Sequence, residues 1–248
     1  MEKGYWEKIA PTYESAIFDV LKNDSAGKIV KAIHRFASKK KSVIDIGCAV
    51  GKWMPVLSPI FKTVWAIDIS AKNLAIARKK NKQYKNIIYE CVDMSAAKLK
   101  PQQYDCAICI NAILTESLKK RNLFFKHMAS FIKKGGDLIL VVPSLESKLF
   151  SHIIANKYNV DDAKNDIVPT GKSAIRQIRL IKDGVTDIDD VPTKHFIKEE
   201  LDLLLTLAGF KVEKIEKIKY KWSTEFHKPP SWLKNPQPWD WMVKAKKK

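Results

Sequence analysis

A regular alternation between Val- and Ile-rich runs and helix-period segments is the sequence feature that most constrains the fold of this chain. Strands are expected at 42–46, 63–68, 86–92, 104–110 and 137–142, and helices between them at 53–60, 71–80 and 119–131. Apolar strands that are each followed by a helix are typical of a parallel sheet covered on both faces. The sequence therefore predicts a doubly wound α/β fold.

The segment before the first strand is expected to be helical. Helix-period patterns cover 13–21 and 25–36, and Ser25 is in position to cap the second helix. We therefore predict an N-terminal helical cap over residues 1–40.

The alternation is interrupted after the fifth strand. Gly135 and Gly136, before that strand, are typical of the C-terminal stop of the preceding helix. Beyond the strand, residues 145–192 contain a predicted helix, a polar loop, a strand-like run and a turn signal, expected at 145–158, 159–174, 175–181 and 182–184. We interpret this stretch as an insertion or a lid.

The closing part of the chain resumes the pattern. A helix is predicted over 196–210 with Gly209 as its stop, followed by strands at 212–220 and 239–243. No internal repeat or low-complexity linker divides the chain, so we expect a single domain spanning 1–248.

Composition narrows the class of protein. The chain has 248 residues, 46% of them apolar, and a formal net charge of +18. Such a positive field attracts phosphates or acidic partners, but the lysines are spread along the whole length, which favours a solvated surface over a nucleic-acid footprint. No apolar run approaches the roughly 18 residues of a membrane span and no signal peptide is recognisable, so we expect a cytoplasmic protein without a membrane partner.

Cys106 and Cys109 form a C-x-x-C motif without a second pair of metal ligands. Residues three apart on a strand point to opposite faces, so we expect no zinc site and no other metal here.

The run VIDIGCAVGKW places Asp45, Gly47, Cys48 and Gly51 between the first strand and the next helix. Glycine allows a sharp turn and a close approach of the backbone to a ligand, and helix N-terminal amides face the same crevice. A dinucleotide site would need a G-x-G-x-x-G pattern, which Ala49 interrupts. A nicotinamide-dependent oxidoreductase is therefore the weaker reading of this loop.

The pattern D-x-G-C-x-x-G resembles the first motif of class I S-adenosylmethionine-dependent methyltransferases. That resemblance implies a Rossmann-like sheet of seven strands, the last antiparallel to the other six, and S-adenosyl-L-methionine as cofactor. Asp68 closes the second strand 23 residues after Asp45, near the offset of about 20 at which a carboxylate takes ribose hydroxyls. Ile69 follows it, and the alternative role for Asp68 is a cap for the next helix.

Three further positions are assigned by the resemblance. Asp93 matches the residue that contacts the adenine amino group, and Met94 supplies a backbone amide and apolar cover. Asn111, after the fourth strand, matches a residue beneath the methionine part of the cofactor that faces the acceptor. Turn and strand-end roles are the structural alternatives for these positions.

The N-terminal aromatic residues Tyr5, Trp6 and Tyr13 match a Tyr-rich helix that covers the cofactor in related sequences. By that analogy they line the entrance for the substrate. Equally, they could pin the N-terminal helices to the core.

The sequence names no catalytic residue. Many small-molecule methyltransferases carry a His after the fourth strand, where this chain has LTE at 114–116. Candidates for a general base are Glu116, His152, His195 and Tyr158. Paired acids at 161–162 and 189–190 are read as solvated loops.

Sequence motifs that this chain lacks narrow the range of methyl acceptors. No N-P-P-Y or D-P-P-Y run and no Pro-Cys pair follows the fourth strand, which disfavours base methylation, and no appended nucleic-acid module is visible. We therefore favour a small molecule methylated on oxygen or nitrogen. The alternatives are an RNA or protein methyltransferase, or a non-catalytic methyltransferase-like protein that binds through its basic surface; the oligomeric state is open.

Overall fold

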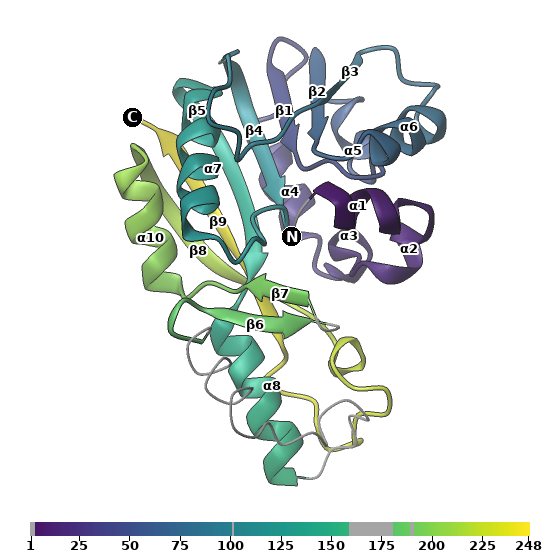
Figure 1. Cartoon of the computed structure of the whole chain (residues 1–248), viewed down its shortest axis with the longest axis vertical. Coiled ribbons are helices and arrows are strands. Elements are labelled where there is room, and N and C mark those ends of the chain that lie inside the picture. The colour runs from purple at the N-terminus through teal and green to yellow at the C-terminus, as the bar shows by residue number, and fades with distance from the viewer. Residues whose placement is uncertain (1–2, 101, 159–180, 189–190) are drawn as a thin grey trace.

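The computed structural model describes residues 3–100, 102–158, 181–188 and 191–248, and its frame is a seven-stranded sheet (Figure 1). The strand order is β3-β2-β1-β4-β5-β9-β8. The strands are β1 (Ser42–Ile46), β2 (Thr63–Asp68), β3 (Ile87–Cys91), β4 (Tyr104–Ile110), β5 (Ile132–Pro143), β8 (Phe210–Lys219) and β9 (Trp239–Lys247). β9 pairs antiparallel with both β5 and β8, and the other pairings are parallel. The predicted doubly wound sheet with an antiparallel last strand is confirmed.

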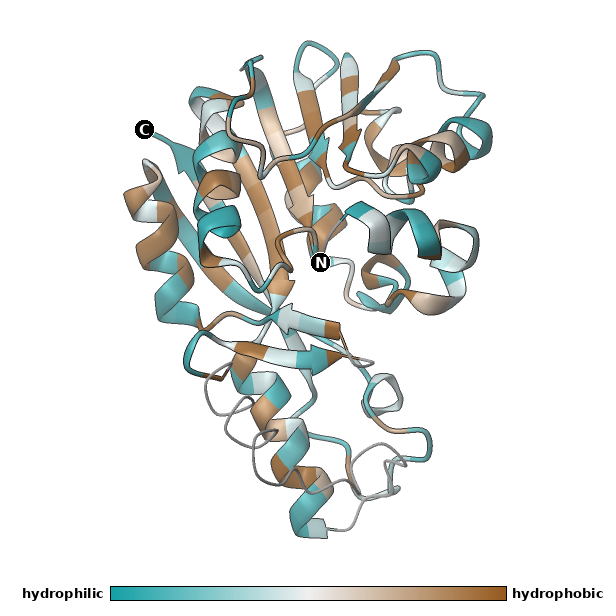
Figure 2. Cartoon of the chain, in the orientation of Figure 1, coloured by the Kyte–Doolittle hydropathy of each residue, from teal (hydrophilic) through white to brown (hydrophobic). Residues whose placement is uncertain are grey.

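Helices cover both faces of this sheet. One face packs against α7 (Leu118–Ser130) and α10 (Lys198–Leu207), and the other against α4 (Lys28–His34), α5 (Met54–Leu57) and α6 (Ala71–Lys80). Figure 2 shows the central strands as predominantly apolar, which is expected where both faces are buried. Two separate apolar clusters result, one on each side of the sheet.

The two cysteines of the C-x-x-C motif belong to different clusters. Cys106 packs on the α4 and α5 side, and Cys109 packs on the α7 side. The expectation that their side chains lie on opposite faces is confirmed. Across the described residues, no group of three or more His, Cys, Asp or Glu side chains could hold a metal ion.

The N-terminal region is helical but more broken than predicted. It consists of α1 (Lys3–Ile9), η1 (Ala10–Thr12), α2 (Tyr13–Ala16), α3 (Val20–Asn23) and α4. The continuous helix predicted over 13–21 is wrong because Ile17 takes an extended conformation and Asp19 caps a new helix by accepting from the Lys22 N–H.

The capping role expected of Ser25 is also wrong. The residue before α4 is Gly27, with φ of 60°, and the N–H of Ile29 donates instead to the Asp24 carboxylate at 2.8 Å. A carboxylate one position upstream takes the place of the expected hydroxyl.

Gly135 and Gly136 do not end a helix. α7 ends at Ser130, and both glycines lie inside β5. Tyr104 of β4 pairs with Ile132, but Cys106 pairs with Asp137, so the glycines occupy a bulge in β5. Glycine permits the bulge because Gly135 has φ of 77°.

The segment after β5 forms a lobe below the sheet in Figure 1. It contains α8 (Leu145–Tyr158), as predicted, and an antiparallel hairpin of β6 (Val185–Ile188) and β7 (Val191–Lys194) that was not predicted. The strand expected at 175–181 lies almost wholly outside the described residues. After β8, η2 (Trp222–Thr224) leads back toward β9. Within the described part of the chain, no helix has the length and apolar character needed to cross a membrane.

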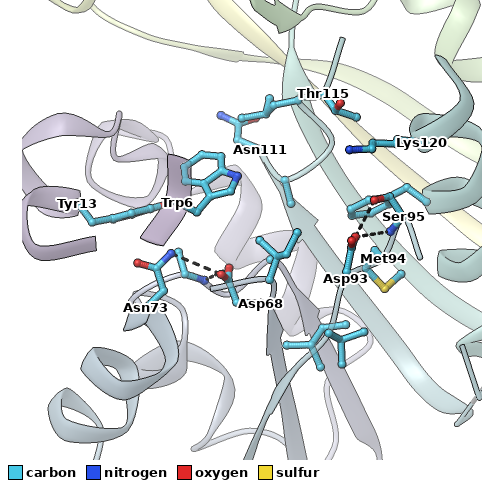
Figure 3. Close-up of a pocket in the computed structure, with 18 residues that line it drawn as sticks. Trp6, Tyr13, Asp68, Asn73, Asp93, Met94, Ser95, Asn111, Thr115 and Lys120 are labelled. Carbon is cyan, nitrogen blue, oxygen red and sulfur yellow. Dashed lines mark hydrogen bonds between the residues drawn. The ribbon is translucent and has the colours of Figure 1, made fainter. Parts of the chain in front are cut away.

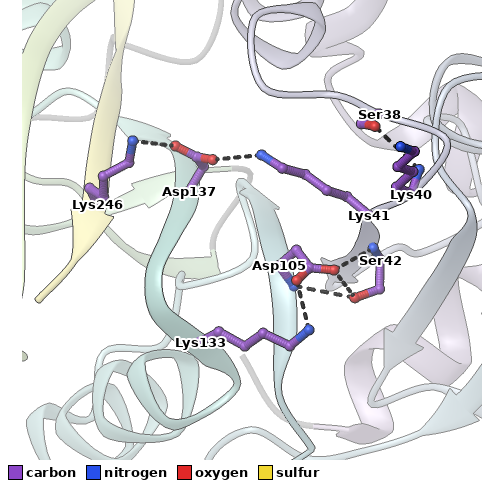
Figure 4. A network of polar contacts seen from close by, with 8 residues as sticks. All are labelled: Ser38, Lys40, Lys41, Ser42, Asp105, Lys133, Asp137 and Lys246. Atoms are coloured by element: carbon purple, nitrogen blue, oxygen red, sulfur yellow. Dashed lines mark hydrogen bonds and ion pairs between the residues drawn. The ribbon is translucent and has the colours of Figure 1, made fainter.

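Polar contacts join the strands at the amino edge of the sheet (Figure 4). Asp105 of β4 accepts from the backbone and hydroxyl of Ser42 at 2.8 Å each, and it pairs with Lys133 at 2.7 Å. Asp137 pairs with Lys41 and Lys246 at 3.4 Å each. Partial burial opposes ionisation of Asp105, but its partners outweigh that effect and hold the pKa of the carboxyl below its usual range.

Replacing Asp105 should therefore destabilise the protein more than replacing Asp137. We expect Asp105→Asn to lower the free energy of unfolding by about 1 kcal/mol and Asp137→Asn by less than about 0.5 kcal/mol. Because the folded pKa of Asp105 is depressed, its contribution is present above pH ~4 and is lost as pH falls. Urea unfolding of both variants at pH 7 and pH 3.5 measures this, and equal losses for the two variants would contradict it.

Candidate cofactor-binding site

A cavity lies where the carboxyl ends of β1, β2 and β4 meet (Figure 3). It encloses about 780 Å³, counting the space at its open mouth. In an open α/β sheet, this edge is where ligands bind, at the point where the strand order reverses. The lining residues are Trp6, Tyr13, Gly47, Ala49, Ile67, Asp68, Ile69, Asn73, Val92, Asp93, Met94, Ser95, Asn111, Ala112, Leu114, Thr115, Lys120 and Phe124.

The loop after β1 forms one wall of the cavity. The N–H groups of Gly47 and Cys48 both donate to the Ile67 carbonyl, which fixes the loop against β2. Gly47 has φ of 77°, and a Cβ there would lie 2.4 Å from the Ala112 Cβ. Only glycine fits this position.

Ala49 takes the left-handed conformation that glycine usually occupies in such loops, with φ of 46°. This costs about 1–2 kcal/mol for an L-residue. Its N–H donates to Asp68 Oδ2 at 2.9 Å, which holds the conformation. The alanine at this position therefore keeps a left-handed backbone and adds a methyl group to the cavity wall.

Asp68 ties three segments together at the end of β2. Its Oδ1 accepts from the Ser70 N–H at 2.8 Å and from Asn73 Nδ2 at 3.4 Å, and its Oδ2 accepts from Ala49. The capping residue of α6 is Ser70, whose hydroxyl accepts from the Asn73 N–H. Burial raises the pKa of the Asp68 carboxyl, and the backbone donors act in the opposite direction.

Asp45 lies beneath the loop and outside the cavity lining. It is 1% exposed, and its Oδ2 has no hydrogen-bond partner among the described residues. Burial, followed by the charge of Asp68, raises the pKa of Asp45 to about 8. Cys48 and Gly51 are likewise outside the lining, where Gly51 packs against Asn81.

The far wall is formed after β3 by Asp93, Met94 and Ser95. Asp93 Oδ1 accepts from both the N–H and the hydroxyl of Ser95, at 2.8 Å and 2.7 Å. The Met94 carbonyl contacts His127 Nδ1 at 3.0 Å, which anchors this turn to α7. The expected turn role of Asp93 thus coexists with a place in the cavity wall.

Asn111 stands at the opposite end of the cavity, after β4. Its φ of 49° is left-handed, which asparagine tolerates better than most residues. Its N–H donates to the Val141 carbonyl, and its Nδ2 donates to Asp240 Oδ2 at 3.1 Å. Oδ1 of Asn111 is buried without a partner among the described residues.

The N-terminal helices cover one side of the mouth. Trp6 and Tyr13 both line the cavity, and their ring centroids are 6.3 Å apart. Tyr5 is not in the lining but packs edge-on against Trp6 at 5.1 Å. Glu7 accepts from the Ala71 N–H at 2.7 Å, which joins α1 to α6. Burial raises the pKa of Tyr13 well above its usual range.

None of the candidate bases lies in the cavity lining. His195 is buried behind β6, where Nδ1 contacts Thr186 and the Thr193 carbonyl, and burial lowers the pKa of His195 to about 4. Tyr158 packs against Trp232 in the lower lobe. After Asn111 along the chain, the polar side chains that line the cavity are Thr115 and Lys120 (Figure 3).

Several lining residues were not singled out from the sequence, because they are ordinary residues in loops and helix starts. Asn73, Ser95, Thr115, Lys120 and Phe124 are the clearest examples. Ser95 carried a usable signal, because an Asp-x-Ser turn lets the serine bond back to the carboxylate. Lys120 lies in the first turn of α7, and it lines the cavity because of where this helix begins in space, which the sequence does not reveal.

Comparison with known families shows which family the chain belongs to. Residues 21–215 match the family model described as a methyltransferase domain. The chain belongs to the class I S-adenosylmethionine-dependent methyltransferases. S-adenosyl-L-methionine is the cofactor of this family.

Curated relatives share part of their length with this methyltransferase. A probable S-adenosylmethionine-dependent methyltransferase of Saccharomyces cerevisiae is 30% identical over 131 residues, covering 50% of this chain and 43% of that protein. A ubiquinone biosynthesis O-methyltransferase of Coxiella burnetii is 27% identical over 117 residues, covering 47% and 49%. The chain thus spans about half the length of the curated relatives it matches.

Solved structures show the same fold. A methyltransferase from Methanosarcina mazei has a TM-score of 0.63 at 17% identity, covering 87% of this chain and 96% of that one. An N-methyltransferase from Bradyrhizobium japonicum, in complex with S-adenosyl-L-homocysteine, has a TM-score of 0.60 at 12% identity and covers 99% and 97%.

Substitution of Gly47 should disrupt the cavity. Gly47→Ala places a methyl group against Ala112 and forces an L-residue to a φ of 77°. We expect a loss of about 1–3 kcal/mol in stability and roughly 10-fold or more in affinity for S-adenosylhomocysteine. Thermal unfolding and calorimetric titration measure the two effects. Gly135→Ala is the matched control, because Gly135 has the same φ with no neighbour within 4 Å of an added Cβ; equal losses of affinity would contradict the prediction.

Asp45 should make the ligand-free protein less stable as pH rises. A folded pKa of about 8 lies above the unfolded value near 4, so the folded state holds the extra proton and loses stability between these pH values. Asp45→Asn removes this loss, and we expect it to exceed the parent protein in stability at pH 8.5 by more than about 1 kcal/mol, with the gain shrinking toward pH 5. Urea unfolding across this pH range tests the sign.

Proposed function

We propose that this protein transfers the methyl group of S-adenosylmethionine to an oxygen or nitrogen atom of a small-molecule acceptor. The observation that carries the proposal is that Gly47, Asp68, Asp93 and Asn111, which lie at or just after the carboxyl ends of four different strands, line one cavity. The protein is proposed to form a single functional domain over 1–248.

The chemistry of the lining fits this cofactor. The cavity walls carry the carboxylates of Asp68 and Asp93 and the carboxamide of Asn111, which are hydrogen-bond acceptors. S-adenosylmethionine offers matching donors in its ammonium group, ribose hydroxyls and adenine amine. A pyrophosphate would instead bring negative charge beside two carboxylates, which disfavours a dinucleotide.

Each predicted residue then has a specific role. Asp68 would accept from the ribose hydroxyls, with Ile69 beside it, while Asp93 would accept from the adenine amine and Met94 would cover the base. Asn111 would face the methionine part. Asp45, Cys48 and Gly51 would act from beneath, by shaping the loop whose Gly47 backbone approaches the ligand.

The cofactor supplies an electrophilic methyl group on a sulfonium, and the protein's task is to align the acceptor in a water-poor space. Alignment of this kind can contribute roughly 7–11 kcal/mol. Trp6 and Tyr13 would exclude water from the mouth, with Tyr5 supporting Trp6 from behind. No general base is assigned, because the four candidates lie away from the lining.

The residues at the end of the cavity beyond Asn111 favour a small acceptor. Leu114, Thr115, Lys120 and Phe124 form that end, and the Leu114 carbonyl accepts from the Lys194 N–H of the β6–β7 hairpin at 2.9 Å. We propose that residues 145–192 act as an insertion that supports this wall. The name of the Coxiella burnetii relative, a ubiquinone biosynthesis O-methyltransferase, agrees with a small organic acceptor.

A screen for release of S-adenosylhomocysteine tests the proposal. Phenols, amines and carboxylic acids form the small-molecule arm, and tRNA and protein extracts form two further arms. Turnover with a small molecule supports the proposal. Turnover with only tRNA or extract would replace the acceptor class, and cofactor binding without turnover in any arm would favour the non-catalytic alternative.

Asp68 is the side chain whose loss should weaken the cofactor most. Because hydrogen bonds to a charged group contribute about 1.5–3 kcal/mol, we expect Asp68→Asn to reduce affinity for S-adenosylmethionine by roughly 10- to 100-fold. Calorimetric titration measures the change. Asp137→Asn, at the opposite edge of the sheet, is the control, and an unchanged affinity in Asp68→Asn would contradict the assignment.

A further inference from the structure

Exposed lysines gather at the amino edge of the sheet, which is the edge opposite the cavity. In a doubly wound fold, the loop that leads into each parallel strand lies at this edge, so residues far apart in the sequence become neighbours. The loops that lead into β1, β2 and β3 each carry one or two exposed lysines, namely Lys39, Lys40, Lys62, Lys82 and Lys85.

The other half of the sheet continues this row of positive charge. β5 and β8 begin at the amino edge, and the antiparallel β9 ends there. Their exposed lysines at this edge are Lys133, Lys134, Lys211, Lys246 and Lys248. Every strand except β4 thus brings at least one exposed lysine to the same edge, where Figure 2 shows hydrophilic loops. We call this row of lysines the basic edge. The fold gathers charges that are scattered along the sequence.

Few acidic side chains offset this charge. Among the described residues, the ion pairs at this edge all involve Asp105 or Asp137 (Figure 4). Lys40, Lys62 and Lys134 form no ion pair with any residue that the structure describes. The basic edge therefore keeps a large excess of positive charge.

The ends of helices do not account for these three lysines. A helix dipole favours positive charge in the last turn of the helix, and its effect falls off beyond that turn. Lys40, Lys62 and Lys134 lie six, five and four residues beyond the ends of α4, α5 and α7. Like charges in a row repel one another, so the row favours a partner that supplies closely spaced negative charge.

We propose that the basic edge binds the phosphate backbone of a nucleic-acid duplex without reading its sequence. The row crosses a sheet of seven strands, and a strand spacing of about 4.8 Å makes it about 29 Å long. A duplex carries one negative charge per roughly 1.7 Å of its axis, so it presents many phosphates over this length. Lysine suits phosphate contacts because its ammonium group is a compact point charge.

Two features favour a duplex over other polyanions. Neighbouring strands of a sheet rotate by about 20–25°, so the strand ends do not lie in one plane and a flat lipid surface would reach only part of the row. Among the described residues, none of the exposed large hydrophobic side chains lies at the strand ends that carry these lysines. The basic edge thus lacks the apolar anchors typical of membrane-surface segments and the aromatic platforms on which single strands stack.

The basic edge is separate from the cavity. β1, β2 and β4 contain 5, 6 and 7 residues, and at about 3.3 Å per residue the two edges lie about 16–23 Å apart. A duplex held at the amino edge would leave the cavity open. The inference therefore does not rest on the proposed function.

Two variants with the same change in net charge test the inference. The edge variant replaces four exposed lysines of the row with glutamine: Lys40→Gln, Lys62→Gln, Lys134→Gln and Lys211→Gln. The control variant replaces four exposed lysines at the start of α10 or between β8 and β9: Lys198→Gln, Lys221→Gln, Lys228→Gln and Lys234→Gln.

The probes are a short RNA duplex, a DNA duplex of the same sequence, a second RNA duplex of unrelated sequence, and vesicles of phosphatidylserine and phosphatidylcholine. Fluorescence anisotropy measures binding of the duplexes, and co-sedimentation measures binding to the vesicles, between 50 and 200 mM salt. Thermal unfolding shows whether both variants fold like the parent protein.

We expect the parent protein to bind duplexes with a slope of about −4 or steeper in a plot of log affinity against log salt, since each phosphate contact contributes about −0.9. The edge variant should lose roughly 30-fold or more in affinity at low salt, with a slope shallower by about 3, whereas the control variant should lose less than about 3-fold. The two RNA sequences should bind equally. Tighter binding of the RNA or of the DNA duplex identifies which of them is the partner.

Equal losses in the edge and control variants would show that net charge alone attracts the duplex, and they would overturn the inference. Binding to the vesicles alone, or no binding of the parent protein to any duplex at 50 mM salt, would also overturn it. A parent protein that binds duplexes but neither S-adenosylmethionine nor S-adenosylhomocysteine would contradict only the proposed function.

Discussion

The hydrogen bonds around the Asp68 carboxylate are the contacts on which the arrangement of the site depends. One carboxylate receives N–H groups from the loop after β1 and from the start of α6, so that both segments are held at the carboxyl end of β2. Without it, the left-handed Ala49 would lose the hydrogen bond of its N–H group, and only the bonds of Gly47 and Cys48 to the Ile67 carbonyl would hold the loop against β2. The shape of the cavity therefore follows from a buried charge bonded to backbone amides.

Buried carboxyl groups recur around this edge of the sheet. Asp45, Asp68 and Asp240 are each less than a tenth exposed, and burial is the main cause that raises the pKa of each one. Placing three acids in a poorly solvated region costs stability unless donors or positive charge compensate. The protein supplies donors to Asp68 and Asp240, but none of the described residues donates to Oδ2 of Asp45. A ligand that carries positive charge and several N–H and O–H groups suits such an edge electrostatically.

The centre of the sheet was predictable from the sequence because β1, β2, β4 and the second half of β5 are mostly buried and are rich in apolar residues. The predicted bounds of the first, second and fourth strands match β1, β2 and β4. The N-terminal helices were less predictable, since short helices such as α2 and α3 depend on local caps and packing more than on periodicity. The β6–β7 hairpin is short and contains Pro192, so it carries a weak strand signal.

The site, too, contains residues that the local sequence identifies and residues that only the folded chain reveals. Motif positions pointed to Gly47, Asp68, Asp93 and Asn111, which line the cavity, but also to Asp45, Cys48 and Gly51, which do not. The partner of Asn111 could not be found this way, because Asp240 sits in the last strand and nothing in its local sequence connects it to β4. That strand is inserted between β5 and β8 rather than added at an edge, so Asp240 reaches Asn111 only when the sheet is complete. A residue of the last strand therefore supplies the hydrogen-bond partner of Asn111. The geometry of this end of the cavity thus depends on the whole sheet having formed.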